Sequence, residues 1–323
     1  MLLDTASLYF RAFYGVPDSL KRADGTSVNA VRGLLDMIAR LVAEFEPTHL
    51  VACWDDDWRP HWRVELIPSY KAHRVEQVVP AGPDIEEVPD PLEAQLPMIR
   101  ETLGLLGIPI VGVAAHEADD VIGTLATTAT MPVDVVSGDR DLFQLVDDDR
   151  GVRVIYTARG MNRLELVTNE WVVAKYGIEA SQYADFATLR GDTSDGLPGV
   201  AGVGEKTAAG LLGDFGSLDA MLAVASGDPD AASAAPATMS ASMRAKLVNA
   251  HDYLAVAPTV VNVVRDLDLP SAEELGARLA PVTGARRETL EDLAEEWNLG
   301  GSVPRVLASL DRTAGAADST AAG

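Results

Sequence analysis

Carboxylates follow each of the short apolar runs in the first half of the chain. One acid follows MLL, another follows HLVACW, and groups of acids stand in HEADD after PIVGV and in SGDRD after VDVVS. A further pair stands in GDTSD, where the spacing of three predicts one face of a helix. The candidate metal ligands are Asp4, Asp55, Glu117, Asp119, Asp120, Asp139, Asp141, Asp192 and Asp195.

Carboxylates gathered at one place repel one another and persist only when they are protonated or bind cations between them. Oxygen ligands without His or Cys favour Mg²⁺ or Mn²⁺ over zinc. Two such ions roughly 4 Å apart can clamp the attacking and leaving oxygens of a phosphoryl displacement. The acids therefore predict a metal-dependent site for phosphoryl transfer or phosphodiester hydrolysis.

Each acid taken alone has an ordinary structural interpretation as a helix N-cap or a turn residue. The recurrence of acids at matching positions after several strands makes that interpretation weaker for the set. Asp56 and Asp57 stay ambiguous, because any of the three acids at 55–57 could face the site.

The elements that must position these acids read as an α/β fold. Apolar runs at 49–54, 109–113, 133–137 and 152–156, with the opening MLLD, predict strands, and 28–44, 92–106 and 119–128 predict helices between them. Such alternation predicts a mostly parallel central sheet. The carboxyl ends of parallel strands share one edge, where ligands bind. That edge is where the acids should meet.

The pattern changes along the chain and predicts four parts. These are an α/β domain over 1–167 with a flexible, proline-rich loop at 75–91, a helical subdomain over 168–265, a helical extension over 266–311 and a disordered tail over 312–323. Residues 226–242 read as a flexible insertion.

A glycine-rich stretch, LPGVAGVGEKTA at 197–208, lies within the predicted helical subdomain. It is not a P-loop, because Glu205 separates Gly204 from Lys206. Gly199, Gly202 and Gly204 fit a hairpin between two helices, whose exposed backbone can hold a phosphate at the following helix or a monovalent cation. An ordinary glycine-rich connection between helices is the alternative.

Basic and aromatic residues could serve the same site. Lys71 and Arg74 stand three apart, the spacing of one helix face, and could neutralise phosphate charge, although two surface cations would look the same. Phe10, Phe13 and Tyr14 could stack on a base, but core packing is expected for two of the three.

The amino-acid composition limits which classes of protein this chain can belong to. The 323 residues include 49 acidic and 26 basic side chains, a net charge of −23, and 47% are hydrophobic. The single Cys53 excludes a disulfide framework, and no membrane span or signal peptide is expected, so we expect a cytoplasmic protein. The acidity argues against a nucleic-acid partner, since phosphate binding normally uses Lys and Arg.

The motifs nevertheless resemble those of a known family. From Asp4 to at least Val264 the chain is similar to the bacterial 5′ nucleases, namely the 5′→3′ exonuclease domain of DNA polymerase I and its free-standing relatives, which are related to flap endonucleases. The motifs that carry the resemblance are LYFRA, PTHLVACWD, YKAHR, EADDVIGTLA, SGDRDLFQLV and GDTSDGLPGVAGVGEKTA.

The resemblance implies a PIN-like (resolvase-like) α/β domain followed by a helical subdomain with a helix–hairpin–helix, or helix–three-turn–helix, element. It places Asp4, Asp55, Glu117, Asp119, Asp139, Asp141 and Asp195 at metal-site positions, with Asp120 and Asp192 as further acids of that cluster. Lys71 and Arg74 match the basic residues that reach the scissile phosphate. The DNA-binding positions are Phe10, Arg11, Gly199, Gly202, Gly204, Lys206 and Thr207.

The resemblance also implies two or more Mg²⁺ or Mn²⁺ ions, potassium at the hairpin, and an arch or gateway for single-stranded 5′ ends near residues 70–95. It implies a monomeric 5′→3′ exonuclease and 5′-flap endonuclease that acts on flap, nicked or gapped DNA, with RNA–DNA hybrid as a further substrate. The chain departs from the family at Gly196, where Asn is common, and we expect a stand-alone member. A non-catalytic DNA-junction binder and a small-molecule metal phosphohydrolase are the competing hypotheses.

Overall fold

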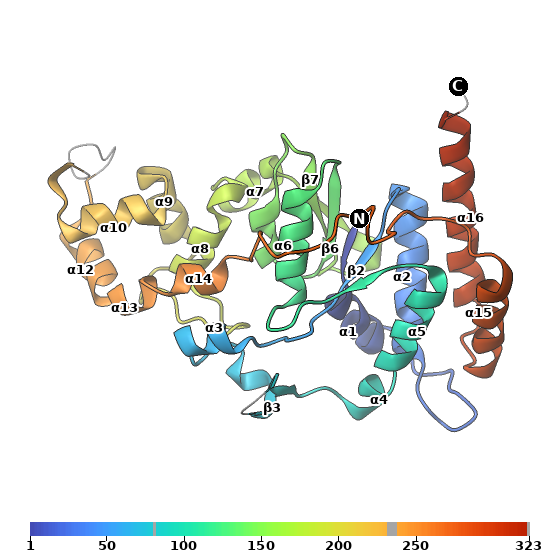
Figure 1. The fold of residues 1–323 in the computed structure, drawn as a ribbon. Helices are drawn as coiled ribbons and strands as arrows, with labels where there is room; N and C mark the ends of the chain where they lie inside the picture. Colours follow the sequence, from blue (N-terminus) through green and yellow to red (C-terminus); the bar gives the residue numbers. More distant parts are fainter. Residues whose placement is uncertain (80–81, 231–237, 322–323) are drawn as a thin grey trace.

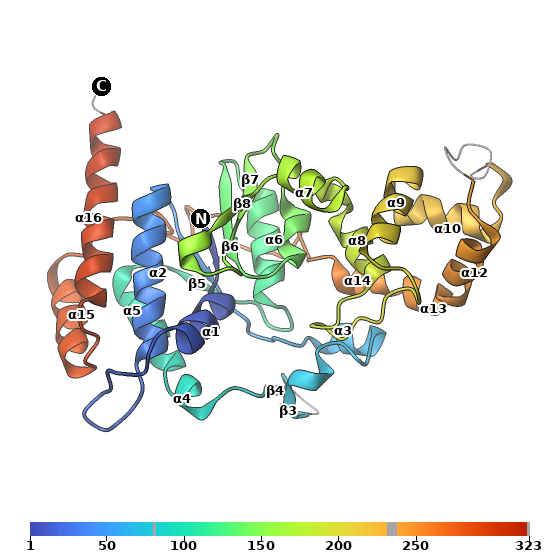
Figure 2. The same ribbon diagram turned by 180° about the vertical axis from the view of Figure 1, so that it is seen from behind.

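A six-stranded sheet forms the centre of the molecule (Figures 1 and 2). The computed structural model describes residues 1–79, 82–230 and 238–321, with side chains as far as Arg312. The strand order is β5-β2-β1-β6-β7-β8, and every pairing is parallel except that of β7 with β8. The strands are β1 (Leu2–Asp4), β2 (Val51–Cys53), β5 (Ile110–Val111), β6 (Val133–Ser137), β7 (Val152–Tyr156) and β8 (Glu165–Val167). The predicted mostly parallel sheet is confirmed, and β8 was not predicted from the sequence.

Alternate residues of the central strands enter two different cores, because successive side chains of a strand point to opposite faces. Leu2 and Val135 pack in the core that contains helix α6 (Ala118–Thr128). Leu3 and Val136 pack in the core formed with α1 (Thr5–Gly15), α2 (Asn29–Phe45) and α5 (Leu96–Leu106). Burial on both faces explains why the strands read as continuous apolar runs.

The segment between β2 and α5 is more ordered than the predicted loop over 75–91. It contains α3 (His61–Leu66), the 3-10 helix η1 (Ala72–Arg74), strands β3 (Val75–Gln77) and β4 (Ile85–Glu86), and α4 (Asp90–Glu93). β3 and β4 pair antiparallel. The buried Arg59 holds this hairpin through a 2.5 Å ion pair between its Nη1 and Asp84 Oδ2, and the Trp58 indole donates to the Asp84 carbonyl. The irregular-loop prediction missed the hairpin because its anchor lies in a distant part of the sequence.

A helical part extends from one side of the sheet domain (Figure 1, left). It comprises α7 (Asn169–Tyr176), η4 (Ala180–Gln182), α8 (Tyr183–Arg190), α9 (Glu205–Phe215), α10 (Leu218–Ser226), α12 (Ala241–Asn249), α13 (His251–Leu254) and α14 (Ala257–Val261), all of which follow β8 in the chain. The short helices η2 (Asp141–Leu145) and η3 (Met161–Arg163) belong to the sheet domain's own connections. Of the predicted insertion at 226–242, residues 231–237 lie outside the described residues.

The C-terminal part packs on the opposite side of the sheet domain (Figure 1, right). α15 (Gly284–Glu296) lies against α5, and α16 (Ser302–Ala321) lies along α2. Within the predicted helical extension over 266–311 the first helix begins only at Gly284, because Pro270 and Pro281 interrupt the segment before it and the chain there pairs with residues 48–50 through Ala277 and Leu279. The predicted disordered tail over 312–323 is helical as far as Ala321.

A membrane span requires a helix that is both long and apolar. Within the described ranges no single helix meets both, and only α9 and α10 taken as a pair, bent by 81°, satisfy them together.

Candidate active site

Seven of the nine predicted acids meet at the carboxyl edge of the sheet. A cavity of about 220 Å³ has Asp4, Asp55, Glu117, Asp119 and Asp139 among its lining residues. A smaller adjoining space of about 20 Å³ shares Glu117 and Asp119 and adds Asp141 and Asp195. We call these seven residues the acid cluster. The topological rule that gathers strand ends at one edge accounts for all of them except Asp195.

Local hydrogen bonds fix the cluster's orientation. Asp4 caps α1 by accepting from the Ser7 amide at 3.1 Å, and its other oxygen accepts from the Ser137 hydroxyl at 2.5 Å. Asp55 accepts from the Ala118 amide at 2.8 Å at the start of α6. The side chains are thus held by the first turns of the helices that follow β1 and β5.

Burial and mutual repulsion raise the pKa values of several cluster acids. Burial, with Asp55 and Asp139 nearby, raises the pKa of Asp4 to about 7, although the Ser137 hydroxyl opposes the shift. Burial and Asp139 raise the pKa of Asp195 to about 6 against Lys71. Burial and the Asp139 carboxylate raise the pKa of Asp119 and that of Asp141 well above the ordinary range. This electrostatic pattern is that of a site built for added positive charge.

The donor set fits divalent cations. It consists of carboxylates alone, and Asp141 Oδ1 is buried without a hydrogen-bond partner. In residues 1–79, 82–230 and 238–321 no three acids stand close enough to surround one ion, so an ion would have to draw them together. This carboxylate oxygen of the cluster is therefore still free to accept a bond.

Both predicted cations reach the cluster. Lys71 ion-pairs with Glu117, and Arg74 Nη2 lies 3.0 Å from Asp195 Oδ1. Burial alone would lower the pKa of Lys71, but Glu117, Tyr70 and Asp195 outweigh it and raise that pKa, so the side chain stays charged.

The sequence predicted that a helix would carry Lys71 with Arg74 and another would carry Asp192 with Asp195. Both predictions are wrong. Lys71 has a left-handed φ of 47° and precedes the single turn η1, in which Arg74 lies. Asp192 and Asp195 lie in a tight turn closed by a bridge between Asp192 and Leu197, not on a helix. The turn is attached to the Lys71 segment, because the Lys71 amide donates to the Asp195 carbonyl at 2.9 Å.

Asp120 and Asp192 line neither of the two cavities and are paired with arginines. Arg63 binds both oxygens of Asp120 at 2.9 and 2.7 Å. Asp192 ion-pairs with Arg190 at 3.0 Å and Arg140 at 3.4 Å. Burial raises the pKa of Asp192, but hydrogen bonds from Ser194 and the two arginines outweigh it, so the pKa is lowered. Arginines thus balance the charges of these two acids, whereas five acids of the cluster have no ion-pair partner among the described residues, namely Asp4, Asp55, Asp119, Asp139 and Asp141.

Sequence reasoning missed three residues of the site. Arg63 is 3% exposed and donates to Glu117 Oε1 at 2.9 Å, and the Tyr70 hydroxyl donates to the same oxygen at 2.6 Å. Glu86, from β4, lines the larger cavity. Tyr70 and Arg63 precede Lys71 in the same basic segment, so proximity to Lys71 was the available signal, whereas nothing marked Glu86.

Two of the three aromatic residues, Phe10 and Phe13, pack against the core that contains α1, α2 and α5, as expected. Phe10 is half-buried, lines the larger cavity and lies 5.1 Å from the Tyr9 ring. Phe13 is also half-buried, and Tyr14 is 72% exposed. Arg11 follows Phe10 on α1, and its Nε is buried without a partner. Of these three residues, Phe10 is therefore the one that lines the cavity of the acids, as Trp58 also does.

The glycine hairpin connects α8 to α9 away from the acid cluster. Gly199 has φ +66°, and a Cβ there would stand 2.5 Å from the Gly191 nitrogen, so only glycine fits. Gly202 has φ +72°, and its carbonyl accepts from Lys246 Nζ at 2.9 Å. Gly204 precedes α9, whose first turn contains the exposed Lys206 and the half-buried Thr207. The hairpin predicted between two helices is present.

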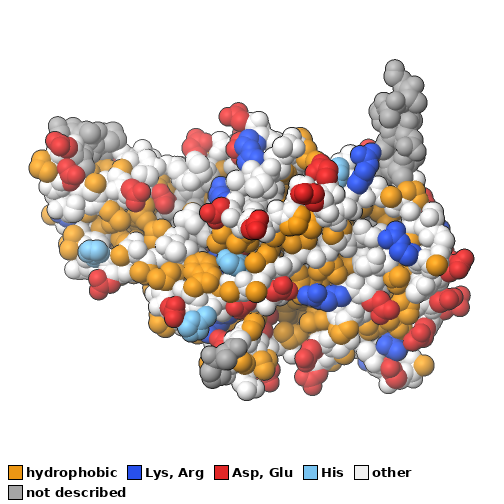
Figure 3. Space-filling model, in the orientation of Figure 1, with side chains coloured by type: hydrophobic (Ala, Val, Ile, Leu, Met, Phe, Trp, Pro, Cys, Tyr) orange, Lys and Arg blue, Asp and Glu red, His pale blue; other side chains and the backbone are white. Residues whose placement is uncertain are grey.

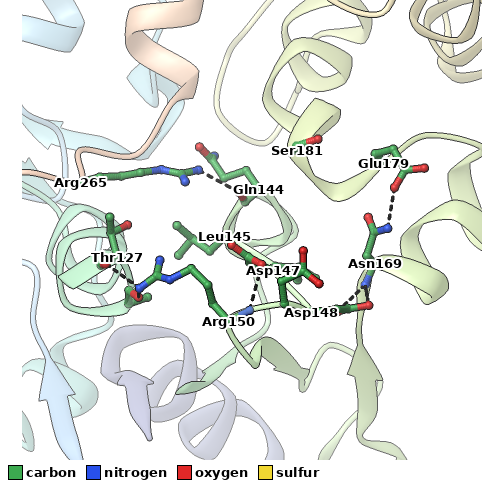
Figure 4. A pocket seen from close by; sticks show the side chains of 13 residues that line it. Thr127, Gln144, Leu145, Asp147, Asp148, Arg150, Asn169, Glu179, Ser181 and Arg265 are labelled. Carbon is green, nitrogen blue, oxygen red and sulfur yellow. Dashed lines mark hydrogen bonds between the residues drawn. The ribbon is translucent and has the colours of Figure 1, made fainter. Parts of the chain in front are cut away.

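Another cavity, with a volume of about 460 Å³, is larger than both cavities of the acid cluster (Figure 4). Its polar side chains are largely paired: Arg150 donates to the carbonyls that end α6, and the Asn169 amide groups bind Asp148 and Glu179. None of the seven cluster acids lines this cavity. Size alone therefore does not locate the chemistry.

The chain is similar to 5′-3′ exonucleases along most of its length. Residues 1–177 match the 5′-3′ exonuclease N-terminal resolvase-like domain, and residues 178–282 match the 5′-3′ exonuclease C-terminal SAM fold. A 5′-3′ exonuclease of Streptomyces coelicolor is 58% identical over 310 residues, 96% of this chain and 99% of that protein. One of Mycobacterium tuberculosis is 46% identical, covering 98% of each chain. DNA polymerase I of Mycobacterium bovis is 44% identical over 69% of this chain and 24% of its own length.

Solved structures share the fold at low sequence identity. The bacteriophage T5 D15 protein, co-crystallised with metal ions, superposes with a TM-score of 0.62 at 16% identity, covering 96% of this chain and 99% of that one. The catalytic core of Rad2 in complex with DNA gives 0.58 at 18% identity, covering 96% and 91%. Both domains of the chain match family models of 5′-3′ exonucleases, and two 5′-3′ exonucleases are 58% and 46% identical to it. The chain therefore belongs to the 5′-3′ exonuclease family.

Proposed function

We propose that this protein is a divalent-metal-dependent 5′ nuclease that hydrolyses DNA phosphodiesters as a 5′→3′ exonuclease and as a structure-specific 5′-flap endonuclease. The observation that carries the proposal is the acid cluster, with its unpartnered Asp141 oxygen and two adjacent cations, in a chain of the 5′-3′ exonuclease family.

The proposed cofactors are two or more Mg²⁺ or Mn²⁺ ions held by Asp4, Asp55, Glu117, Asp119, Asp139, Asp141 and Asp195. When bound, such ions supply Lewis-acid activation of water and of the phosphate. Asp120 and Asp192 have a different proposed role, since Arg63 and the Arg140–Arg190 pair already bind them. They would hold neighbouring segments in place around the site.

Lys71 and Arg74 are the proposed catalytic cations. Lys71 lines the cavity from the position before η1 and stays protonated beside Glu117, so it can neutralise charge that develops on a phosphate oxygen. Arg74 is 35% exposed at its side chain, so its guanidinium can meet a phosphate without losing its contact to Asp195. Their positions depend on the turn at 192–197, which bonds to the Lys71 backbone.

The hairpin at 197–204 is the proposed grip on duplex DNA. Its backbone groups and Lys206 contact phosphates and read shape instead of sequence. Phe10 and Arg11 contact the strand near the acids. Flap, nicked and gapped duplexes are the proposed substrates, with RNA–DNA hybrid as a further one. Potassium at the hairpin would use carbonyls other than that of Gly202, which Lys246 already occupies. We also propose a monomer in a reducing cytoplasm, consistent with the single, buried Cys53.

A substrate comparison tests this function against its two competitors. The wild-type protein is given 5′-flap DNA, nicked duplex and p-nitrophenyl phosphate, each with Mg²⁺, Mn²⁺ or EDTA. We expect metal-dependent cleavage of both DNAs, with mononucleotides and flap-length products. DNA binding without cleavage would favour the junction binder. Hydrolysis of the small ester without DNA cleavage would favour the phosphohydrolase.

A further inference from the structure

We propose that the β3–β4 hairpin is part of the divalent-metal site, because the Arg59–Asp84 ion pair holds it where Glu86 adds a further carboxylate to the acid cluster. This inference rests on the proposed nuclease function. It adds to the site a residue that does not come from the edge of the central sheet.

Glu86 reaches the cavity of the acid cluster from a different part of the fold. It lies on β4, in the segment that passes below the sheet domain in Figures 1 and 2. The cluster acids, apart from Asp195, stand at or after the ends of strands of the central sheet. Glu86 nevertheless lines the same cavity of about 220 Å³ as Asp4, Asp55 and Asp139. The hairpin and the sheet edge therefore supply acids to one space.

The carboxylate of Glu86 has no partner of its own. Among the described residues no hydrogen bond or ion pair to this half-buried side chain is present, and only its backbone is used, in the pairing of β4 with β3. Burial raises the pKa of Glu86, with Asp55 and Glu117 nearby, although Arg74 and Lys71 oppose the shift. A half-buried acid among other acids is stabilised by an added cation.

A buried ion pair holds the hairpin in place. Arg59 is 7% exposed, and its Nη1 lies 2.5 Å from Asp84 Oδ2. The other guanidinium nitrogens donate to the carbonyls of Tyr70 at 2.6 Å and Pro68 at 3.2 Å. Arg59 therefore joins the hairpin to the segment that leads to Lys71, so the two are fixed relative to each other.

Backbone contacts fix the chain on both sides of Glu86. Before it, the Asp84 carbonyl accepts from the indole of Trp58 at 2.7 Å, and Trp58 itself lines the cavity. After it, the Glu87 amide donates to the Arg74 carbonyl at 2.8 Å. Because none of these contacts uses the side chain of Glu86, its carboxylate is held in position while its oxygens stay available.

Without a cation, Glu86 would oppose the proposed reaction. It adds a negative charge to a cavity whose other acids already repel one another, and a DNA phosphate that enters there brings another. Carboxylate oxygens are the ligands that Mg²⁺ and Mn²⁺ prefer. An acid held firmly at this place is therefore favourable only when divalent ions offset its charge.

Binding of Mn²⁺ in the absence of DNA tests the inference without relying on cleavage. The protein is titrated with Mn²⁺, and free Mn²⁺ is followed by electron paramagnetic resonance. We expect Glu86→Gln to weaken Mn²⁺ binding by roughly tenfold. The matched control is Glu87→Gln, which removes the same charge from the exposed neighbour and should leave the affinity unchanged. Both variants should fold, because no hydrogen bond to either side chain is present among the described residues.

Asp84→Asn tests whether the ion pair positions Glu86. The variant removes the charge that Arg59 binds, but its side-chain oxygen can still accept from the Val79 amide. Alone, it should weaken Mn²⁺ binding several-fold. Combined with Glu86→Gln it should cause no further loss, because Asp84 acts through Glu86. Thermal unfolding confirms that each variant is folded. An equal loss from Asp84→Asn in both backgrounds would refute the positioning role.

Cleavage at varied Mn²⁺ concentration separates a role in metal binding from a role in the chemical step. Glu86→Gln should need roughly tenfold more Mn²⁺ for half-maximal single-turnover cleavage of 5′-flap DNA, and its maximal rate should stay within a few-fold of the wild-type rate. Equal Mn²⁺ affinities of Glu86→Gln and Glu87→Gln would overturn the inference. A wild-type protein that binds no Mn²⁺, or that cleaves no flap DNA, would instead overturn the proposed function on which the inference rests.

Discussion

At the scale of single residues, the acid cluster destabilises the fold, and a bound cation would restore that stability. Asp4, Asp119 and Asp141 are buried among other carboxylates, and their pKa values are raised by burial and by their neighbours. A carboxylate held for structure alone would have an arginine, as Asp120 has Arg63. The contrast between the two kinds of acid is the local sign of a metal site.

The raised pKa values predict how stability depends on pH when chelator removes divalent ions. Asp4 and Asp195 titrate in the folded state at about 7 and about 6, against an ordinary value of 3.8, so the folded protein binds more protons than the unfolded chain. Stability should therefore fall between about pH 4 and pH 7, by an amount on the order of a few kcal/mol. Urea unfolding in EDTA measures it, and Asp4→Asn should flatten the slope. Stability that rises over this interval would refute the assignment.

Lys71 is predicted to act in the reaction and not in folding. Lys71→Met should lower the single-turnover rate of flap cleavage by roughly a hundredfold or more, because a charged donor to the phosphate is lost. The fold should persist, since Glu117 keeps Arg63 and Tyr70 as partners. Lys175→Met, at an exposed position on α7, is the matched control and should retain the wild-type rate. A Lys71 variant with an unchanged rate would exclude its proposed role.

Spacing and strand position were enough to predict which acids meet, but not which acids are neutralised. Asp120 lies one residue from Asp119, yet it is bound by Arg63, a residue 57 positions earlier in the chain. Asp192 is similarly bound by Arg140, which is 52 positions away. Pairings at such separations depend on tertiary structure, so local spacing could not separate these two acids from the seven.

At the scale of elements, the turn at 192–197 must fit against the Lys71 segment. Gly196 has φ +71°, and a Cβ there would stand 2.0 Å from the Ser69 carbonyl oxygen, while the Ser69 hydroxyl donates to the Gly196 carbonyl at 2.7 Å. This contact leaves no room for a side chain at residue 196.

Gly196→Ala should therefore destabilise the protein by more than about 1 kcal/mol and reduce cleavage, because the turn that carries Asp195 would move away from Lys71. Gly210→Ala is the matched control: nothing lies within 4 Å of its Cβ position on α9, so it should stabilise by about 0.5–1 kcal/mol. Thermal unfolding and flap cleavage are measured for both. Equal behaviour of the two variants would contradict the proposed fit.

The long, buried elements were predictable from sequence, and the short or partner-dependent ones were not. Burial of β1, β2 and β6 on both faces produces apolar runs that a sequence shows directly. The edge strand β8 is half exposed and antiparallel, and the β3–β4 hairpin depends on the ion pair from Arg59, so neither has a local signal. α16 was missed beyond residue 311 because its apolar content falls there.

At the scale of the whole molecule, the net charge of −23 limits how the protein can bind DNA. Figure 3 shows acidic side chains spread over the face it presents, with few lysines and arginines among them. A part of the negative charge belongs to the acid cluster itself. The expectation that acidity excludes a nucleic-acid partner is therefore wrong in its premise, because family membership and the cluster both point to phosphate chemistry.

This charge predicts weak DNA binding that depends on divalent cations and on salt. The apparent affinity for flap DNA should fall when EDTA replaces Mg²⁺ and should fall again between roughly 50 and 200 mM salt. Fluorescence anisotropy over both series measures it. Tight binding in EDTA at the higher salt concentration would contradict the prediction.

The central claim is that the acid cluster cleaves DNA. The most direct test is single-turnover cleavage of a 5′-flap duplex in Mn²⁺ by the wild type, by Asp139→Asn and by the exposed control Asp149→Asn. The Asp141 amide donates to Asp139 Oδ1 at 2.9 Å, and the side-chain carbonyl of the Asp139→Asn variant can still accept that bond, so the change removes charge while leaving the contact available. The account predicts a loss of roughly a hundredfold or more for Asp139→Asn and wild-type cleavage for Asp149→Asn. Undiminished cleavage by Asp139→Asn would contradict it.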